Sequence, residues 1–364
     1  MSRIALNARL LISGKLEGTG RFTHQCFKRL IESRPNDKFL LIFDRKPSEE
    51  FNYGENVEMV NLFPPARRPW LFDIWFDFTV AWKLKNWGAD VFVSTDGYIS
   101  RRTSVPQLNV IHDINFEHNP QWLPKRYARH FRQRFPEYAR LSNKLCTVSD
   151  YSKKDIEANY GVTDITVISN APDQMFNPIS EKQPIRDRHT SGNPYIVFVG
   201  SLHPRKNIHG MVHAFEEYRM LGGSFDLLMI GVSMWRDEKA ISKNVHYAGR
   251  LNDENLAQAV AGADAMLYLP FFEGFGVPIV EAMASGVPVV ASNCTSVPEV
   301  CGGAAAFLVA PEDYKSAALA LLKLERDDEF RNSIIELGLK RSSDFSWDRS
   351  AEILSNEIDN LLNG

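Results

Sequence analysis

Residues 271–286, FFEGFGVPIVEAMASG, decide the fold of this chain. They follow an apolar run, Ala265–Leu269, that predicts the end of a buried strand. Pro278 stands where a helix would begin and Gly286 where it would end, which is the asymmetry typical of helices. The stretch therefore predicts a strand, a glycine loop and a helix in direct succession.

The glycine loop predicts a site for an anion. Gly274 and Gly276 let the backbone come close to a ligand, and the helix start that follows points unpaired N–H groups at it. Glu273 and Glu281 place two carboxylates beside this predicted anion site. Two negative charges at a site for an anion need an explanation. A carboxylate accepts bidentate hydrogen bonds from neighbouring hydroxyls. A ligand that carries both hydroxyls and phosphate, such as a sugar nucleotide, accounts for both features.

The same stretch resembles the signature of an enzyme family. Glu273 and Glu281, separated by seven residues inside EGFGVPIVEAMASGVPVVAS, resemble the retaining glycosyltransferases of family 4. The resemblance implies the GT-B fold, an α/β architecture of two Rossmann-like domains facing a cleft, with a C-terminal helix that crosses back to the first domain. A plain βαβ unit with an acidic surface helix is the alternative. The glycines, both carboxylates and the PVVAS strand match in order, which favours the family.

Length and patterning agree with two domains. A chain of 364 residues has ample material for two cores, and strand-like runs alternate with helical ones, which indicates a parallel α/β architecture. The domain boundaries that we expect are an N-terminal Rossmann-like acceptor domain at 1–170, a linker rich in Pro, Asn and charge at 171–193, a C-terminal Rossmann-like nucleotide-sugar domain at 194–345, and a returning helix at 346–364.

The positions of the strands follow from the apolar runs. The predicted strands are Arg3–Asn7, Lys38–Phe43, Val57–Asn61, Asp90–Ser94, Gln107–Ile111, Lys144–Val148, Ile165–Ile168, Tyr195–Val199, Phe225–Ile230, Val245–Tyr247, Ala265–Leu269 and Val287–Ala291.

The charge is unevenly distributed. Residues 1–180 carry 25 Lys and Arg against 20 Asp and Glu, whereas the remainder carries 17 against 25. This predicts different partners for the two halves and argues against nucleic-acid binding, which favours a strongly basic domain.

No apolar run approaches the roughly 18 residues of a transmembrane helix, and no signal peptide is evident. The four cysteines lack metal-ligand spacing. We expect a cytoplasmic protein, peripheral at the inner face of the cytoplasmic membrane.

Two motifs of the first half match family elements. His112 and Asp113 stand just past a predicted strand, where open α/β sheets place ligands. The resemblance implies that His112 contacts the donor sugar; a structural histidine is the alternative.

The second motif is the loop at 14–21. Its Gly18 and Gly20 match a family loop near the donor phosphates and acceptor. That loop lacks the third glycine of a dinucleotide fingerprint, which disfavours oxidoreductase chemistry; an ordinary tight turn is the alternative.

A basic pair opens the second half. Arg205 and Lys206 follow the strand that ends near Gly200, and two adjacent cations at such a turn fit a pyrophosphate. The family has a basic pair at this place. Many members carry arginine directly after the glycine, where this chain has Ser201.

No Asp-x-Asp element lies where a donor-bound metal would be expected. We therefore expect a metal-independent enzyme without a cofactor, in which a helix N-terminus and the basic pair offset the phosphate charge.

The resemblance implies retaining transfer of a hexosyl unit from a nucleotide-sugar to a saccharide or lipid-linked acceptor. The predicted catalytic residues are Glu273, His112, Arg205 and Lys206; the predicted donor-binding residues are Gly200, Ser201, Gly274, Phe275, Gly276 and Glu281; the predicted acceptor or phosphate loop holds Gly18 and Gly20; and no metal ligand is predicted. The segments IHDINFEHNP and GSLHPRKN look most like mannosyltransferase-like members that use GDP-mannose or a GDP-deoxymannose in bacterial surface polysaccharide synthesis, such as the O-antigen of lipopolysaccharide. A UDP-sugar donor, a GT-B sugar-nucleotide epimerase without an acceptor, and a non-catalytic scaffold are the alternatives.

Two segments of the first half bear on membrane association. Residues 63–87 are dense in aromatic side chains, which usually form core but can also form an exposed apolar surface for a lipid or a partner. The stretch at 123–135 places apolar residues at four-residue steps on one helix face, and the other faces hold Lys125, Arg126, Arg129, Arg132 and Arg134. A basic amphipathic helix fits an anionic membrane; a solvated face over an apolar stripe in the core is the alternative.

Overall fold

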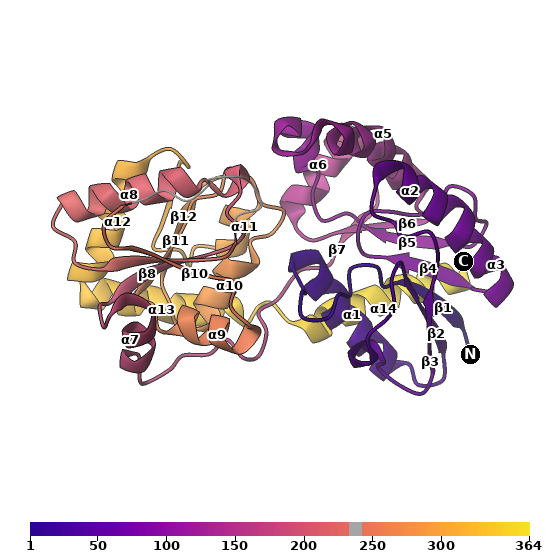
Figure 1. Ribbon diagram of the computed structural model, residues 1–364, viewed down its shortest axis with the longest axis horizontal. Helices are drawn as coiled ribbons and strands as arrows, with labels where there is room; N and C mark the ends of the chain where they lie inside the picture. Colours follow the sequence, from indigo (N-terminus) through magenta and orange to yellow (C-terminus); the bar gives the residue numbers. More distant parts are fainter. Residues whose placement is uncertain (233–241) are drawn as a thin grey trace. The chain divides into compact units, whose positions relative to one another are not determined.

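The computed structural model describes residues 1–232 and 242–364. The chain forms two compact units, and each is built on one parallel sheet (Figure 1). The first unit combines Met1–Asn170 with Trp347–Gly364, and the second comprises Ala171–Ser346. Among the described residues no helix has both the length and the apolar character needed to cross a membrane.

The first unit has a seven-stranded sheet in the order β3-β2-β1-β4-β5-β6-β7, with parallel neighbours throughout. Its strands are β1 (Arg3–Asn7), β2 (Lys38–Phe43), β3 (Val57–Asn61), β4 (Val91–Ser94), β5 (Gln107–Val110), β6 (Lys144–Thr147) and β7 (Ile165–Val167). Its helices are α1 (Gly18–Ser33), η1 (Glu49–Phe51), α2 (Pro69–Ile74), the π-helical η2 (Trp75–Val80), α3 (Ala81–Trp87), α4 (Asn115–His118), η3 (Pro120–Trp122), α5 (Lys125–Leu141), α6 (Asp150–Tyr160) and α14 (Trp347–Asn363). Strands β4 and β5 are buried along their whole length, and β1 is buried except at Arg3, as expected for a parallel sheet covered by helices.

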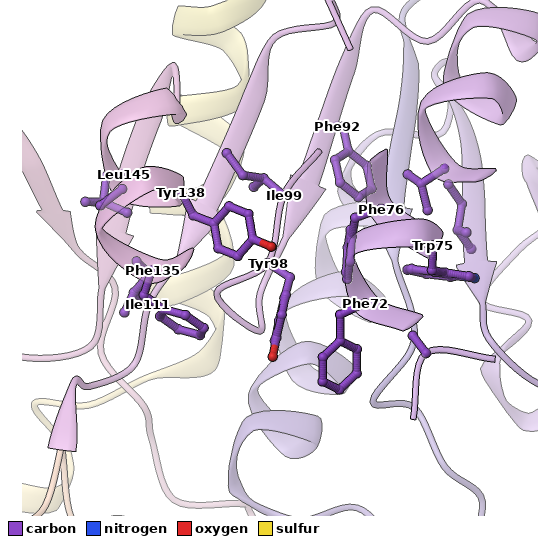
Figure 2. Close-up of a cluster of buried hydrophobic side chains, with 14 of the residues drawn as sticks. Phe72, Trp75, Phe76, Phe92, Tyr98, Ile99, Ile111, Phe135, Tyr138 and Leu145 are labelled. Atoms are coloured by element: carbon purple, nitrogen blue, oxygen red, sulfur yellow. The ribbon is translucent and has the colours of Figure 1, made fainter. Parts of the chain in front are cut away.

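An aromatic core fills one face of this sheet. Figure 2 shows Phe72 and Phe76 on one helical segment beside Tyr98, while Trp75 lies on the other side of Phe76, with its ring centroid 4.7 Å from that of Phe76. The Phe76 and Tyr98 rings stack with their centroids 5.4 Å apart. Each such buried side chain contributes roughly 1.5–3 kcal/mol relative to an exposed one. Much of the aromatic density between residues 63 and 87 is therefore core.

The C-terminal helix packs on the first unit. In α14, Asp348 accepts a hydrogen bond from Arg29 Nε of α1 at 2.5 Å, and Asp359 accepts one from Arg34 Nη2 at 2.8 Å. Leu354 on its inner face is fully buried. The predicted return of the last helix to the first domain is confirmed.

The described part of the second unit contains a six-stranded parallel sheet in the order β10-β9-β8-β11-β12-β13. Its strands are β8 (Tyr195–Val199), β9 (Asp226–Ile230), β10 (Val245–Gly249), β11 (Ala265–Tyr268), β12 (Val289–Ser292) and β13 (Phe307–Val309). Its helices are α7 (Gln183–Thr190), η4 (Pro204–Lys206), α8 (Ile208–Met220), α9 (Asp253–Ala261), α10 (Val277–Ala284), α11 (Val297–Cys301), α12 (Tyr314–Arg326) and α13 (Asp328–Ser342). The α/β class with two Rossmann-like units agrees with the sequence-based prediction.

Every predicted strand is present, with ends that differ by two residues at most. The sequence missed β13, because its three residues are too few for a periodic signal. It pairs with β12 at the sheet edge.

The stretch at 171–193, which was predicted to be a linker, belongs to the second unit and contains α7. Ile185 of this helix is buried, and Arg186 Nη2 donates to Asp264 Oδ1 at 2.7 Å. Pro184 lies in the first turn of α7, where proline is a helix-start signal. The polar composition of residues 171–193 led to the linker prediction in spite of this signal. The partner of Arg186 lies 78 residues away, so local composition could not identify the packing.

Candidate active site

Predicted site residues of the second unit gather where the strand order reverses. Strand β8 pairs with both β9 and β11, and ligands of open parallel sheets bind outside the carboxyl ends of strands at such a point. Gly200, Arg205 and Lys206 follow β8, and Glu273 follows β11. Strand pairing therefore brings together residues that are 67 positions apart in the sequence.

The centre of this site is a buried cluster of four side chains. The Glu273 carboxylate accepts a short hydrogen bond from Lys206 Nζ through Oε1, and one from Arg205 Nη1 through Oε2 at 3.2 Å. The Tyr268 hydroxyl donates to Glu273 Oε1 at 2.9 Å and accepts from Lys206 Nζ at 2.8 Å. Arg205 Nη1 also donates to the Phe272 carbonyl oxygen at 3.0 Å. We call Tyr268, Arg205, Lys206 and Glu273 the carboxylate cluster.

The electrostatics of the carboxylate cluster leave it positive. Burial acts to raise the pKa of Glu273, but the attraction of Lys206 and Arg205 outweighs it and holds that pKa below its usual range. Burial, together with the neighbouring Glu273 charge, raises the pKa of Tyr268 well above that of an ordinary phenol, so the hydroxyl keeps its proton. Two cations against one carboxylate give a net positive charge, which suits a phosphate ligand.

Backbone contacts fix the loop that carries Glu273. The Glu273 N–H donates to Thr295 Oγ1 at 3.1 Å, and the Ser296 hydroxyl lies 3.0 Å from the carbonyl oxygens of both Glu273 and Phe275. The Phe271 N–H donates to the Arg205 carbonyl oxygen at 2.9 Å. The loops after β8 and β11 are therefore held to one another by main-chain contacts as well as by the ion pairs.

The predicted helix after the glycine loop is α10. Gly276 occupies its N-cap with φ +100°, a conformation that side chains rarely adopt, and Pro278 lies in the first turn. Glu281 is buried on this helix. Gly274 lies in the loop between Glu273 and α10, as predicted. Phe275 is buried with its ring against Phe345, so its side chain supports the packing of the unit.

Two glycines approach each other closely at the end of β8. Gly200 has φ +154° and Gly231, just after β9, has φ +146°. A Cβ atom on Gly231 would lie 1.8 Å from the Gly200 carbonyl oxygen, so only glycine fits there. Ser201 follows Gly200 directly and is partly buried. The path of the chain into the basic pair therefore depends on this close approach.

In the first unit, His112 lies past the end of β5, as predicted. Its Nε2 is 3.0 Å from the Thr95 carbonyl oxygen, so Nε2 carries the proton and Nδ1 is the acceptor. Burial lowers the pKa of His112 despite this hydrogen bond and the nearby Asp113, which favours the neutral imidazole. Phe22 packs its ring edge-on at 4.9 Å. Asp113 accepts a hydrogen bond from the Asn115 N–H at 3.0 Å and so shapes the start of α4.

His112 lines a pocket of about 260 Å³ at the carboxyl ends of β1, β4 and β5, which include the switch point of this sheet. Arg9 Nη2 and Asp96 Oδ2 form a largely buried ion pair of 2.6 Å in its wall. The Tyr98 hydroxyl is buried without a hydrogen-bond partner within the described ranges, and its residue lines the same pocket. The pocket thus combines charged groups with aromatic faces.

Gly18 and Gly20 lie in the first turn of α1, because the helix begins at Gly18 rather than after residue 21 as the loop prediction required. A Cβ on Gly20 would lie 2.8 Å from the Leu10 carbonyl oxygen, whereas one on Gly18 would meet no atom within 4 Å. Gly20 therefore serves close packing of the backbone, and Gly18 leaves open space at the helix start.

Four residues of these sites were not predicted from the sequence: Tyr268, Ser296, Arg9 and Asp96. Tyr268, Asp96 and Arg9 could have been noticed, because each lies at or just past the end of a predicted strand. Ser296 carried no such signal, because its contacts come from the tertiary arrangement.

The comparisons with known families cover both units. Residues 17–174 match the family "Glycosyltransferase Family 4", and residues 180–341 match the family "Glycosyl transferases group 1". Neither match contradicts the division of the chain seen in the structure.

Individual proteins agree with these matches. An Escherichia coli O-antigen chain mannosyltransferase B is 28% identical over 92% of this chain and 93% of its own length. Sucrose-phosphate synthase from Thermosynechococcus elongatus has the same fold, with a TM-score of 0.80 at 15% identity over the whole of both chains. Anabaena HepE, solved with UDP-glucose, has a TM-score of 0.75 at 18% identity over 99% of this chain and all of its own. The chain is a glycosyltransferase with the GT-B fold and belongs to the family 4 and group 1 glycosyltransferases.

Proposed function

We propose that the protein transfers a hexosyl unit, with mannose from GDP-mannose or a GDP-deoxymannose favoured, to a saccharide or lipid-linked acceptor of a bacterial surface polysaccharide. The observation that carries the proposal is the carboxylate cluster, which presents net positive charge at the switch point of the second unit. The E. coli O-antigen mannosyltransferase, matched over nearly the whole chain, supports the choice of sugar.

In this proposal Arg205 and Lys206 stabilise the departing nucleoside diphosphate. The leaving group gathers negative charge in the transition state, and preorganised cations in a buried site are worth far more than in water. Glu273 holds both cations in place through its two carboxylate oxygens. We assign Glu273 to the donor-sugar hydroxyls as well, so it would both position the two cations and bind the donor. Glu281, buried on α10, is assigned to the ribose hydroxyls, and Gly200, Ser201, Gly274 and Gly276 to the donor phosphates.

We infer retention at the anomeric carbon. The acceptor oxygen forms the new bond to C1 on the face from which the C1–phosphate oxygen bond breaks, and the acceptor proton passes to the donor phosphate oxygen. This follows from the family resemblance, and His112, neutral at pH 7, is assigned to the donor sugar on the same ground. The stereochemistry of the product, read by proton NMR of the anomeric signal, tests it.

The pocket of the first unit supports an acceptor role. A saccharide presents hydroxyls that hydrogen-bond to charged groups and apolar ring faces that pack on aromatic side chains. Arg9 and Asp96 offer the first, while Tyr98, Phe116 and Phe131 offer the second. The buried Tyr98 hydroxyl would gain a partner from a ligand hydroxyl.

A panel of nucleoside diphosphates distinguishes the donor alternatives. Bound nucleotide stabilises the folded state by mass action, by about 2.7 kcal/mol at a hundredfold excess over Kd. We expect GDP to raise the Tm more than UDP in a thermal-shift assay, and radiolabelled GDP-mannose to yield a labelled saccharide product. Stabilisation by UDP alone would support the UDP-sugar alternative, for which HepE offers a structural precedent. Conversion of the donor sugar without a glycosylated product would support the epimerase.

Metal independence is a separate expectation. Because Arg205 and Lys206 supply two positive charges at the proposed phosphate site, transfer should persist in excess EDTA. The measurement is the initial rate before and after chelation, with a known magnesium-dependent glycosyltransferase as the control. Complete loss of activity that magnesium or manganese restores would contradict this expectation.

A further inference from the structure

The helical segment formed by α2, η2 and α3 has apolar side chains on two opposite faces. Its inner face inserts Phe72, Trp75 and Phe76 into the core (Figure 2). Its outer face exposes large side chains at four-residue steps, with exposed fractions of 58% for Trp70, 37% for Ile74, 53% for Phe78 and 63% for Trp82. We call these four residues the apolar stripe.

The apolar stripe is more than scattered surface hydrophobicity. Single exposed apolar residues are common, but four in line on one helix form a contiguous patch. Phe63, 83% exposed, extends it: the Thr79 hydroxyl, next to Phe78, lies 3.4 Å from the Phe63 carbonyl oxygen. Packing within the unit does not cover this face, so its side chains remain available to a partner.

Cations border the apolar stripe. Arg67, Arg68, Lys85 and Arg102 are exposed, and the Arg102 guanidinium lies 4.4 Å from the centre of the Phe78 ring. Asp73 and Asp77 lie on the same helical segment, but both carboxylates pair with Arg101 and not with these cations. Within the described ranges, none of the four bordering cations has an acidic side chain at ion-pair distance.

In the neighbouring helix α5, which was predicted to be the membrane-binding element, two of the five basic side chains form ion pairs within the protein, and Lys125, Arg126 and Arg129 are exposed. Arg132 is paired with Glu117 at 3.0 Å, and Arg134 with Asp73 at 3.1 Å. Phe135 is buried in the core, as the alternative interpretation of this helix required. Tyr127, at its start, donates to the Arg67 carbonyl oxygen at 3.2 Å, which places α5 beside the border of the apolar stripe.

We propose that the apolar stripe and its border form a docking surface for an anionic lipid bilayer. Tryptophan and phenylalanine favour the boundary between headgroups and acyl chains, and the surrounding cations attract anionic lipid phosphates. A second copy of this chain fits less well, because a symmetric contact over the stripe would bring the same cations face to face. The surface would hold the enzyme reversibly at the membrane, where lipid-linked acceptors reside.

The test is co-sedimentation with sucrose-loaded vesicles of phosphatidylcholine, with or without phosphatidylglycerol. We expect wild type to bind the anionic vesicles, with a blue shift of its tryptophan fluorescence, and to dissociate as salt rises. Each cation near an anionic surface contributes about fivefold to partitioning, so Arg67→Ala/Arg68→Ala/Arg102→Ala should bind about a hundredfold more weakly. Trp70→Ser/Phe78→Ser/Trp82→Ser should lose binding and the blue shift.

A matched control removes apolar side chains of comparable exposure from the second unit: Met220→Ser/Leu319→Ser/Leu337→Ser should bind as wild type does. Circular dichroism verifies that all variants are folded. Wild type that ignores anionic vesicles at low salt would overturn the proposal, and so would a dimer in sedimentation velocity that only the stripe variant dissociates. Vesicle binding is measured without donor or acceptor, so its failure and that of the proposed transfer are distinguishable.

Discussion

Replacing Lys206 by methionine should lower turnover by roughly a hundredfold or more and destabilise the protein at the same time. The turnover effect follows from losing one preorganised charge at the leaving group. The stability effect arises because Glu273, which is 6% exposed, would keep a buried charge without its closest partner, and breaking such a pair costs about 3–5 kcal/mol. Steady-state kinetics and urea denaturation measure the two effects separately.

The double variant Lys206→Met/Glu273→Leu separates catalysis from stability. An apolar pair of similar volume removes the unpaired buried charge, so most of the lost stability should return while turnover stays low. Lys315→Met, an exposed lysine on α12, is the matched control and should leave both quantities unchanged. Wild-type turnover in Lys206→Met, or its recovery in the double variant, would show that the ammonium plays no part in leaving-group stabilisation.

Arg205→Ala belongs to the same prediction and should differ in one respect. Its turnover should also fall by about a hundredfold. The side chain of Arg205 is 23% exposed, whereas that of Lys206 is 9% exposed, and Lys206 still neutralises Glu273. The loss of stability should therefore be smaller than in Lys206→Met, and denaturation of the two variants side by side checks the order.

Gly231→Ala should lower the free energy of unfolding by about 2–3 kcal/mol or more. The new Cβ would collide with the main-chain carbonyl of Gly200, which cannot move aside as a flexible side chain would, and φ +146° is strained for alanine in any case. Because Gly200 leads into Ser201 and the basic pair, KM for the donor should rise as well. Urea denaturation and initial rates provide the measurements.

Gly249→Ala is the appropriate comparison, since Gly249 lies on the adjacent strand β10 and pairs through its carbonyl with the Gly231 N–H at 2.8 Å. It also has a positive φ of +68°, but an added Cβ would meet no atom within 4 Å. Only the left-handed backbone conformation would then be penalised, by about 1–2 kcal/mol. Equal stability losses in the two variants would contradict the role assigned to the contact between Gly231 and Gly200.

The sequence by itself determined the elements and their class. Apolar runs such as Tyr195–Val199 became β8, and Pro278 and Gly286 bracketed α10, because strand periodicity, helix starts and helix ends depend on near neighbours. The same local signals placed Glu273 and Lys206 just past strands, and hence at the edge where parallel sheets bind ligands. The family resemblance, carried by a contiguous stretch, was equally local.

The tertiary structure alone decided which of these residues meet. The contact between Lys206 and Glu273 exists because β8 pairs with β11, and the order of strands depends on contacts across the whole sheet. The same holds for α7, whose polar sequence predicted a linker. Only the tertiary contact between Arg186 and Asp264 shows that this helix packs on the second unit. It holds also for the segment at 69–87, because aromatic residues occupy both of its faces. The face with Phe72, Trp75 and Phe76 packs in the core. The face with Trp70, Phe78 and Trp82 is therefore exposed. Burial is a property of the assembled fold, and local sequence patterns cannot assign it when both faces are apolar.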